Sequence, residues 1–275
     1  MVGPSVGYFV RPPRTQLSEG NYAEVLEDLL NGGGTPATVT NSAGWFLLVH
    51  EAYQQIEDLV LRHSPDVVIT NFGMGECQPK LIPTTTLRWL YTWRPKSHLP
   101  SRALRRLLLK RVNKAYTAWS PKLISALPWT PYRLSPKRFE HELERLVGVV
   151  RKERKALVLM VNASPAGPKL EAILPGTDGR AQEFNAITDR VADRAGDDVE
   201  VIDARTIVQE AGPERAVPDG IHFSAAGHRL IAEALHRRIE SWVARGAGGL
   251  GTSARSENSA DKSGAVGSPR DKAGI

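Results

Sequence analysis

The sequence predicts an α/β protein built around a doubly wound parallel sheet. Two apolar runs, at 66–72 and 156–161, have the length and composition of buried parallel strands. Segments with apolar residues at helical spacing lie before, between and after these runs, as at 136–154. This alternation of strand and helix patterns is typical of a sheet that is covered by helices on both faces.

The other elements follow the same pattern. The helix predicted at 136–154 has Ser135 as its N-cap and Pro136 at its first helical position. Consecutive glycines end the helix predicted at 20–31. The same patterns predict further helices and strands, namely helices at 45–62, 180–195 and 224–244 and strands at 37–41 and 199–202.

The start of the chain leaves almost no room for a first strand, because only Met1 and Val2 precede Gly3. A central parallel strand normally supplies several buried apolar residues. Either this strand is unusually short or the chain is truncated at its beginning. A sheet without its first strand would expose apolar edges, and this favours truncation.

Residues 83–134 break the alternation. They are rich in proline, contain four tryptophans and include one basic helix pattern, Leu104 to Ala118. An insertion after the third strand lies at the carboxyl edge of the sheet, where open α/β folds bind ligands, so we expect it to form a lid. The end of the chain is rich in Gly, Ala and Ser, which predicts a disordered tail at 246–275 after a domain at 1–245.

Composition narrows the class of protein. The 275 residues are 41% hydrophobic and 24% charged, which is ordinary for a globular protein. Cys77 is the single cysteine, so an internal disulfide is excluded and a reducing compartment is indicated. The chain opens with no leader pattern and has no run of about eighteen apolar residues. We therefore predict a cytoplasmic protein.

Charge is unevenly distributed along the chain. Between Lys80 and Lys155 there are 19 Lys or Arg and 4 Glu, a local charge of +15 in a chain of +6. This basic segment is suited to an anionic partner. Three interpretations of its helix remain open: an amphipathic helix packed on the core, a peripheral contact with a membrane surface, and a site for an anionic substrate. No nucleic-acid-binding motif accompanies the charge, so we expect no nucleic-acid partner.

A compact polar motif lies near the end of the predicted domain. Asp219 and His222 are three residues apart, a spacing that allows the carboxylate to contact an imidazole nitrogen on one tight turn. Such a contact fixes the imidazole tautomer and stabilises the protonated ring. Ser224 follows as the N-cap of the last helix. The alternative is an Asp that caps a turn beside a surface His.

The candidate nucleophile is at the other end of the chain. Gly3-Pro4-Ser5-Val6-Gly7 matches G-x-S-x-G, the nucleophile elbow of α/β-hydrolases. That elbow follows a central strand late in the sheet, and four preceding residues leave no room for the earlier strands. Ser5 nevertheless remains a good candidate, because it lies on a Gly-rich loop that opens the first β–α unit.

The order of four motifs along the chain resembles that of the SGNH (GDSL-type) hydrolases over roughly residues 1–245. The motifs are Ser near the start, Gly after the second strand, a Gly-x-Gly loop after the third and D-x-x-H before the last helix. The resemblance implies a three-layer α/β/α, flavodoxin-like fold, to which this chain adds the basic, Trp-rich insertion as a lid or acyl-pocket wall. It also implies a nucleophile, a general base with its orienting carboxylate, and backbone oxyanion donors, namely Ser5, His222, Asp219 and the N–H groups of Ser5 and Gly44.

The chain departs from the family pattern at two positions. Pro4 stands where the family usually has Asp before the serine. Gly75 stands where the family usually has Asn, so no side chain can donate to the oxyanion there, although Gly75 still belongs to the predicted oxyanion hole. Loss of one such donor typically lowers the rate by about 10²–10³.

Three polar residues near these motifs are candidates for substrate contacts. Asn41 and Asn71 could replace the missing amide or serve the strand ends. Glu76 belongs to a Gly73–Lys80 segment that is similar to a G-x-x-[DE]-C-x-P-[RK] subgroup of the family. Glu76 is either a structural anchor, which we favour, or a substrate contact.

The resemblance implies a serine esterase that acts through an acyl-enzyme on a small-molecule ester, without a cofactor. An acyltransferase would use the same residues with another acceptor, and a weakly active SGNH-like binding protein is the third alternative. Ser164 follows a strand but lacks a neighbouring base, so we expect a turn residue, and His228 is expected to pack. No metal-ligand spacing or nucleotide-binding fingerprint occurs in the sequence.

Overall fold

The computed structural model describes residues 1–7, 20–44, 46–79, 81–82, 85–86, 99–127 and 132–246. The chain folds as two units, Met1–Ile239 and Glu240–Ile275. The first unit contains the sheet and the candidate site. The described part of the second unit begins with the last residues of helix α11 (Ala225–Ala244).

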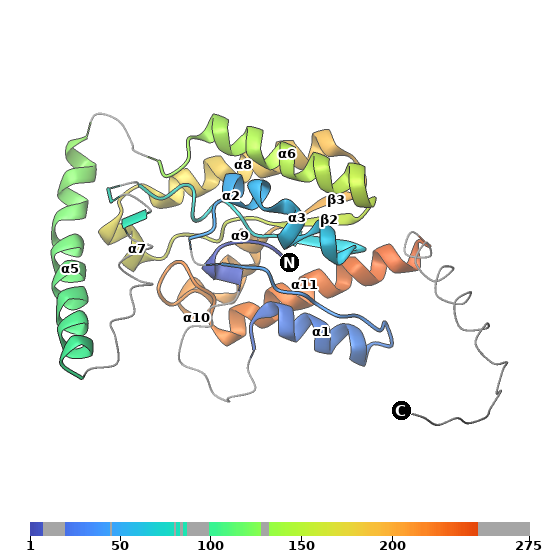
Figure 1. Cartoon of the computed structure of the whole chain (residues 1–275), viewed down its shortest axis with the longest axis horizontal. Coiled ribbons are helices and arrows are strands. Elements are labelled where there is room, and N and C mark those ends of the chain that lie inside the picture. The colour runs from blue at the N-terminus through green and yellow to red at the C-terminus, as the bar shows by residue number, and fades with distance from the viewer. Residues whose placement is uncertain are drawn as a thin grey trace, which may run out of the picture. The chain divides into compact units, whose positions relative to one another are not determined.

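The sheet has three regular strands in the order β1 (Val67–Thr70), β2 (Leu157–Val161) and β3 (Val199–Ile202) (Figure 1). Both pairings are parallel, and Val158 lies opposite Val68 on one side and Val199 on the other. All residues of β2 are buried, as expected of a central strand with helices on both faces. The strands predicted at 66–72, 156–161 and 199–202 are confirmed to within two residues at each end.

The first three residues of the chain extend this sheet. Val2 pairs in parallel with Thr70, through its N–H to the carbonyl of Ile69 at 2.9 Å and its carbonyl to the N–H of Asn71 at 3.2 Å. On their other side, the N–H groups of Ser42 and Gly44 donate to the carbonyls of Met1 and Gly3 at 2.8 and 2.9 Å. Residues 1–3 therefore lie between the 40–44 segment and β1, where a first strand is expected.

The segment predicted as a strand at 37–41 differs from the prediction. It has no regular strand assignment, and its sheet-like hydrogen bonds begin only at Thr40, whose carbonyl accepts from the Met1 amino group at 2.7 Å. The reason is that its partner is only three residues long. The pairing therefore starts late and extends to Gly44.

Helices lie on both faces of the sheet, α1 (Tyr22–Gly32) and α11 along one and α6 (Pro136–Arg154) and α8 (Thr177–Ala195) along the other (Figure 1). Helix α1 begins with a capping box: Asn21 Oδ1 accepts from the N–H of Glu24 at 3.3 Å, and the Glu24 carboxylate accepts from the N–H of Asn21 at 3.0 Å. The predicted helices at 20–31, 136–154, 180–195 and 224–244 are confirmed.

The helix predicted at 45–62 is broken into shorter pieces, namely α2 (Val49–Gln54), α3 (Ile56–Leu59) and a 3₁₀ turn η2 (Leu61–His63). Gln55, between α2 and α3, has non-helical backbone angles. Three further short helices were not predicted from the sequence, namely α7 (Pro168–Ile173), α9 (Ala204–Ala211) and α10 (Pro213–Ala216). None reaches nine residues, which is too short for a helical period to stand out.

The basic helix predicted at Leu104–Ala118 is part of a longer helix, α5 (Leu99–Ala126). It packs on the hydrophobic core through Tyr116 and Ile124, and Ser120 Oγ donates to the carbonyl of Ile173 in α7 at 2.8 Å. Most of the remaining 83–134 insertion and the predicted tail lie outside the described residues. Within the part of the chain that the structure describes, no helix is both long and apolar enough to cross a bilayer.

Candidate active site

Ser5 lies on a 3₁₀ turn, η1 (Ser5–Gly7), that directly follows the sheet residues 1–3. The N–H of Gly7 donates to the carbonyl of Pro4 at 3.0 Å and closes this turn. Ser5 is partly exposed, and its Oγ is 3.0 Å from Nε2 of His222, 217 positions further along the chain. The two ends of the predicted domain therefore meet at a serine–histidine hydrogen bond.

His222 is held by Asp219 through the predicted D-x-x-H turn. Nδ1 of His222 is 2.9 Å from Oδ2 of Asp219. The other oxygen, Oδ1, accepts the backbone N–H of Ile221 at 3.0 Å and of His222 at 2.7 Å. Because the carboxylate accepts from Nδ1–H, Nε2 is left as the acceptor that faces Ser5.

The Asp219 carboxylate is stabilised in its charged form. Partial burial alone would raise its pKa, but the hydrogen bonds from the ring and backbone of His222 and from the Ile221 backbone outweigh burial and hold the pKa below its usual range. Asp219 therefore stays ionised at neutral pH, as an orienting carboxylate requires.

The residues that follow His222 position its loop. Ser224 Oγ accepts the N–H of Gly227 at 3.2 Å and donates to the carbonyl of Arg215 at 2.6 Å. A Cβ at Gly227 would lie 2.4 Å from the carbonyl oxygen of Ala216, so only glycine permits this approach of α11 to α10. The sequence motif after His222 therefore has a structural role, which is to hold the His222 loop and the start of α11 against α10.

His228 anchors α11 to α1. It is fully buried, and its Nδ1 accepts the backbone N–H of Tyr22 at 3.2 Å, with the two rings 5.6 Å apart. The prediction that His228 packs in the fold is confirmed. Ser164 is also buried, in the loop after β2.

Of the three predicted oxyanion donors, Ser5 lies on the nucleophile turn, and Gly75 and Gly44 lie next to it. A Cβ built on Gly75 would be 3.9 Å from Cβ of Pro4, so this loop lies next to the residue before Ser5. The N–H of Gly44, in contrast, already donates to the carbonyl of Gly3 at 2.9 Å. In this conformation the Gly44 N–H serves the pairing of 40–44 with residues 1–3, and its role as an oxyanion donor stays a prediction.

The two candidate asparagines bind backbone atoms. Asn41 Nδ2 donates to the carbonyl of Gly7 at 3.4 Å and its Oδ1 accepts from Ala43 at 3.0 Å. Asn71 Nδ2 donates to the carbonyl of Val161 at 3.5 Å. Both side chains therefore tie strand ends and the Ser5 turn to their neighbours.

Glu76 is fully buried behind the Gly75 loop. Its carboxylate accepts the N–H of Gly73 at 2.8 Å and that of Val49, the first residue of α2, at 2.9 Å. Burial raises the pKa of Glu76 to about 7, although these two hydrogen bonds and Arg133 oppose the shift. These contacts are those of an anchor that joins the Gly73–Glu76 loop to α2.

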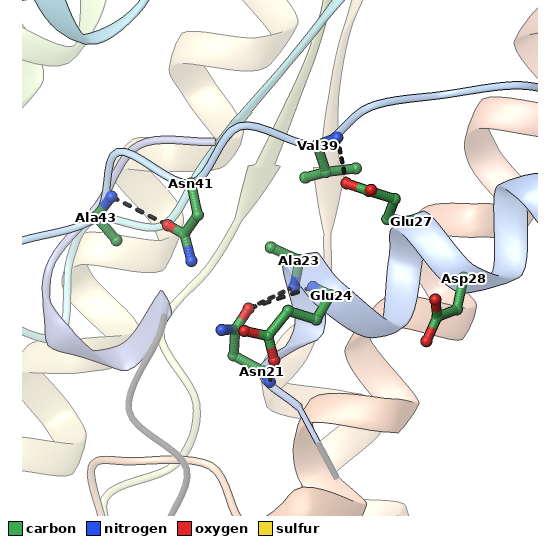
Figure 2. Close-up of a pocket in the computed structure, with 8 residues that line it drawn as sticks. All are labelled: Asn21, Ala23, Glu24, Glu27, Asp28, Val39, Asn41 and Ala43. Carbon is green, nitrogen blue, oxygen red and sulfur yellow. Dashed lines mark hydrogen bonds between the residues drawn. The ribbon is translucent and has the colours of Figure 1, made fainter. Parts of the chain in front are cut away.

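A hollow of about 540 Å³ lies between the start of α1 and the 39–43 segment (Figure 2). Figure 2 shows Glu24, Glu27 and Asp28 on α1 and Asn41 on the facing segment. Glu24 and Glu27 are engaged by the backbone N–H groups of Asn21 and Val39. Ser5 and His222 do not line this hollow, so it is not the candidate active site.

Sequence reasoning missed Arg133 and Phe46, which lie beside the motifs. The guanidinium carbon of Arg133 is 5.5 Å from the centroid of the Phe46 ring. Phe46 follows Gly44 by two residues, and the N–H of Arg133 donates to the carbonyl of Gln78 at 2.9 Å. No pattern in the sequence links residues so far apart.

The fold and the Ser5–His222–Asp219 contact together have the geometry of a serine hydrolase site. Residues 5–230 match the GDSL-like Lipase/Acylhydrolase family, and the chain belongs to this family. Members of this family are hydrolases of ester bonds, and this assigns the chain to that enzyme class. No curated protein matches the chain in sequence.

Solved structures are similar in fold. A lipase/acylhydrolase from Enterococcus faecalis has a TM-score of 0.58 at 15% identity, with 87% of this chain and 94% of that chain covered. A catalytic mutant of an acetylxylan esterase from Geobacillus stearothermophilus has a TM-score of 0.55 at 15% identity, with 86% and 91% covered. An α/β hydrolase from the metagenome of Lake Arreo, Spain, has a TM-score of 0.54 at 16% identity, with 85% and 90% covered. At these identities the likeness shows the fold.

Proposed function

We propose that the protein is a serine-dependent ester hydrolase in which Ser5 is the nucleophile, His222 the general base and Asp219 its orienting carboxylate. The observation that carries this proposal is the hydrogen bond of 3.0 Å between Ser5 Oγ and His222 Nε2, with Asp219 on the opposite ring nitrogen. A serine hydroxyl is a weak nucleophile alone, and an adjacent oriented base is what activates it.

The reaction follows from this arrangement. Ser5 Oγ attacks the ester carbonyl carbon while its proton passes to Nε2 of His222, and the charge on the ring is stabilised by Asp219. The tetrahedral intermediate collapses, and the leaving alcohol takes the proton from Nε2. Water then gives a proton to the same nitrogen and attacks the acyl-enzyme. Collapse of the second intermediate releases the carboxylic acid and restores the Ser5 hydroxyl.

The oxyanion hole is the weaker part of this site. We propose the backbone N–H groups of Ser5 and Gly75 as donors, since the Gly75 loop lies next to Pro4. The N–H of Gly44 would join them only if its hydrogen bond to Gly3 opened. A hole with fewer donors lowers the rate, by about 10²–10³ for each missing donor.

An acyltransferase would share every step up to the acyl-enzyme and would replace water by an alcohol acceptor. The similar structures include acetylxylan esterases and a lipase/acylhydrolase, and this supports small acyl esters as a first substrate class. The single Cys77 keeps the cytoplasm as the predicted compartment. If the protein is instead a weakly active binding protein, little or no ester turnover is expected.

Ester turnover tests the proposal. We expect the protein to hydrolyse 4-nitrophenyl acetate, and Ser5→Ala or His222→Ala to reduce the rate to that of the buffer. Ser164→Ala, at a buried serine in the loop after β2, is the matched control and should retain activity. Full activity of Ser5→Ala, or none in the unaltered protein, would contradict the proposal.

We further propose that α5 contacts an anionic membrane surface. Its 28 residues contain seven Lys or Arg and no Asp or Glu. Trp119 and Leu123, one helical turn apart, are 66% and 50% exposed. Exposed aromatic and aliphatic side chains beside cations favour an interfacial position. Sedimentation with phosphatidylserine vesicles, but not phosphatidylcholine vesicles, should depend on Trp119; equal sedimentation of Trp119→Ala would contradict this.

A further inference from the structure

Arg133 lies on a segment that pairs with the Gly75 loop region. The N–H of Leu134 donates to the carbonyl of Glu76 at 3.3 Å, and that of Arg133 to the carbonyl of Gln78 at 2.9 Å. Tyr132 and Pro79 continue this antiparallel pairing. The Gly75 loop lies next to Pro4, so this pairing joins the Arg133 segment to the loop beside the Ser5 turn.

The guanidinium of Arg133 has no ionic partner within the described residues. Its guanidinium carbon lies 5.5 Å from the centroid of the Phe46 ring. Burial lowers the pKa of Arg133, but an arginine remains charged in proteins. Arg133 is partly exposed, so its guanidinium, with five N–H donors, is open to an anion that reaches it from solvent.

Glu76 does not supply that anion by direct contact. The negative charge of Glu76 is close enough to raise the pKa of Arg133, and this opposes the lowering by burial. Both of its carboxylate oxygens, however, accept backbone N–H groups, those of Val49 and Gly73. Within the described residues no hydrogen bond or ion pair joins Glu76 to Arg133, so the donors of Arg133 are left for another acceptor.

Phe46 connects the Gly44 motif to Arg133. It has a φ of 54°, a conformation that non-glycine residues rarely adopt. Such a backbone persists where the surroundings require it, often at ligand sites. Phe46 lies two residues after Gly44, which is paired with Gly3, and its ring contacts the guanidinium of Arg133.

We propose that Arg133 binds an anionic group, a carboxylate or a phosphate, on the ester substrate. The planar guanidinium matches both groups with paired hydrogen bonds, and its cation–π contact with Phe46 helps to position it. The inference rests on the proposed function, because it concerns the substrate of the Ser5 site. It makes the enzyme selective for charged esters over neutral ones of the same size.

Matched ester pairs test this selectivity and locate the charge. Mono-4-nitrophenyl succinate and 4-nitrophenyl butyrate compare charge on the acyl side. The 4-acetoxybenzoate anion and its methyl ester compare charge on the alcohol side. We expect kcat/KM to favour the anionic member of at least one pair by about tenfold or more, as an expected contribution of a charged hydrogen bond. Arg133→Gln should remove this preference by raising KM and leave the neutral member within about twofold.

Arg133→Lys keeps the charge and should retain part of the preference. Equal losses for both members of a pair in Arg133→Gln would indicate a structural role and overturn the inference. A preference that survives in Arg133→Gln, or no preference in the unaltered protein, would overturn it as well.

A binding measurement separates this inference from the proposed function. Calorimetry with Ser5→Ala measures binding of mono-4-nitrophenyl succinate and 4-acetoxybenzoate without turnover. Binding that is lost in the Ser5→Ala, Arg133→Gln double variant supports the anion site even if the unaltered protein hydrolyses neither ester. Binding that is unchanged in the double variant overturns the anion site even if the protein is an esterase.

Discussion

Oδ2 of Asp219 lies 2.9 Å from Nδ1 of His222, and Oδ1 of the same carboxylate binds the His222 backbone N–H at 2.7 Å. One side chain thus orients both the ring and the backbone of the proposed base. A substitution that keeps the oxygen bound to the backbone N–H but changes the partner of the ring therefore tests the ring tautomer without disturbing the loop.

Asp219→Asn should lower kcat by about 10⁴, since an amide can favour the wrong tautomer of the base while the geometry persists. The pKa of Asp219 is held below its usual range, so its contribution to the free energy of unfolding is fully present above about pH 4 and is lost as pH falls further. Urea unfolding of both proteins should show a constant difference near neutral pH that shrinks in acid. A kcat within tenfold of the unaltered protein would contradict the assigned role.

Gly75→Asn should increase activity. The backbone at Gly75 is outside the left-handed region, and a Cβ would meet Cδ2 of Leu48 at 3.7 Å and Cβ of Pro4 at 3.9 Å, both ordinary contacts. An amide there adds a donor next to the nucleophile turn, and we expect kcat to rise by about tenfold or more. Gly75→Ala fills the same space without a donor and should give no increase. Equal rates for the two variants would contradict the oxyanion assignment.

Gly227→Ala should destabilise the protein and lower activity. The new Cβ would lie 2.4 Å from the carbonyl oxygen of Ala216, which forces α11 away from α10 and displaces the His222 loop. We expect the free energy of unfolding to fall by about 1–3 kcal/mol. Gly148→Ala in α6 is the control: its Cβ would meet nothing within 4 Å, so the helix should gain about 0.5–1 kcal/mol. Denaturant unfolding measures both, and a neutral Gly227→Ala would argue against the close contact.

Stability should fall as pH rises toward neutrality because of Glu76. Its pKa is raised from 4.5 to about 7 in the folded protein, so the folded state binds the proton more tightly than the unfolded state. The contribution is favourable below about pH 4.5 and is lost as pH rises through about 7. Glu76→Gln, which cannot ionise, lacks this dependence. The stability of the unaltered protein relative to Glu76→Gln should therefore decrease between these pH values, and an increase would show that the backbone hydrogen bonds outweigh burial.

The sequence predicted the layers of the fold because long amphipathic helices and buried strands have clear periods. The helix at 136–154 was predicted at its observed bounds, since Ser135 and Pro136 mark its start. The helix at 45–62 was not, because the break at Gln55 involves no Gly or Pro. The place of residues 1–3 in the sheet depends on partners that are about 40 and 70 positions away, which no local pattern records.

The candidate site was likewise predicted only in part. Asp219 and His222 could be paired from their spacing, and Ser5 joined them through the resemblance of the motif order. The hydrogen bond of Gly44 to Gly3 was missed because it depends on the register of the short first strand. Arg133 and Phe46 were missed because their contact joins segments 87 positions apart that no motif spans.

The central claim is that Ser5 is an activated nucleophile. The most direct measurement is covalent labelling with a fluorophosphonate, followed by mass spectrometry of the modified peptide. The account predicts one adduct, on Ser5, that is absent in Ser5→Ala and strongly slowed in His222→Ala. An adduct on another serine, or an unlabelled protein that still turns over esters, would contradict it.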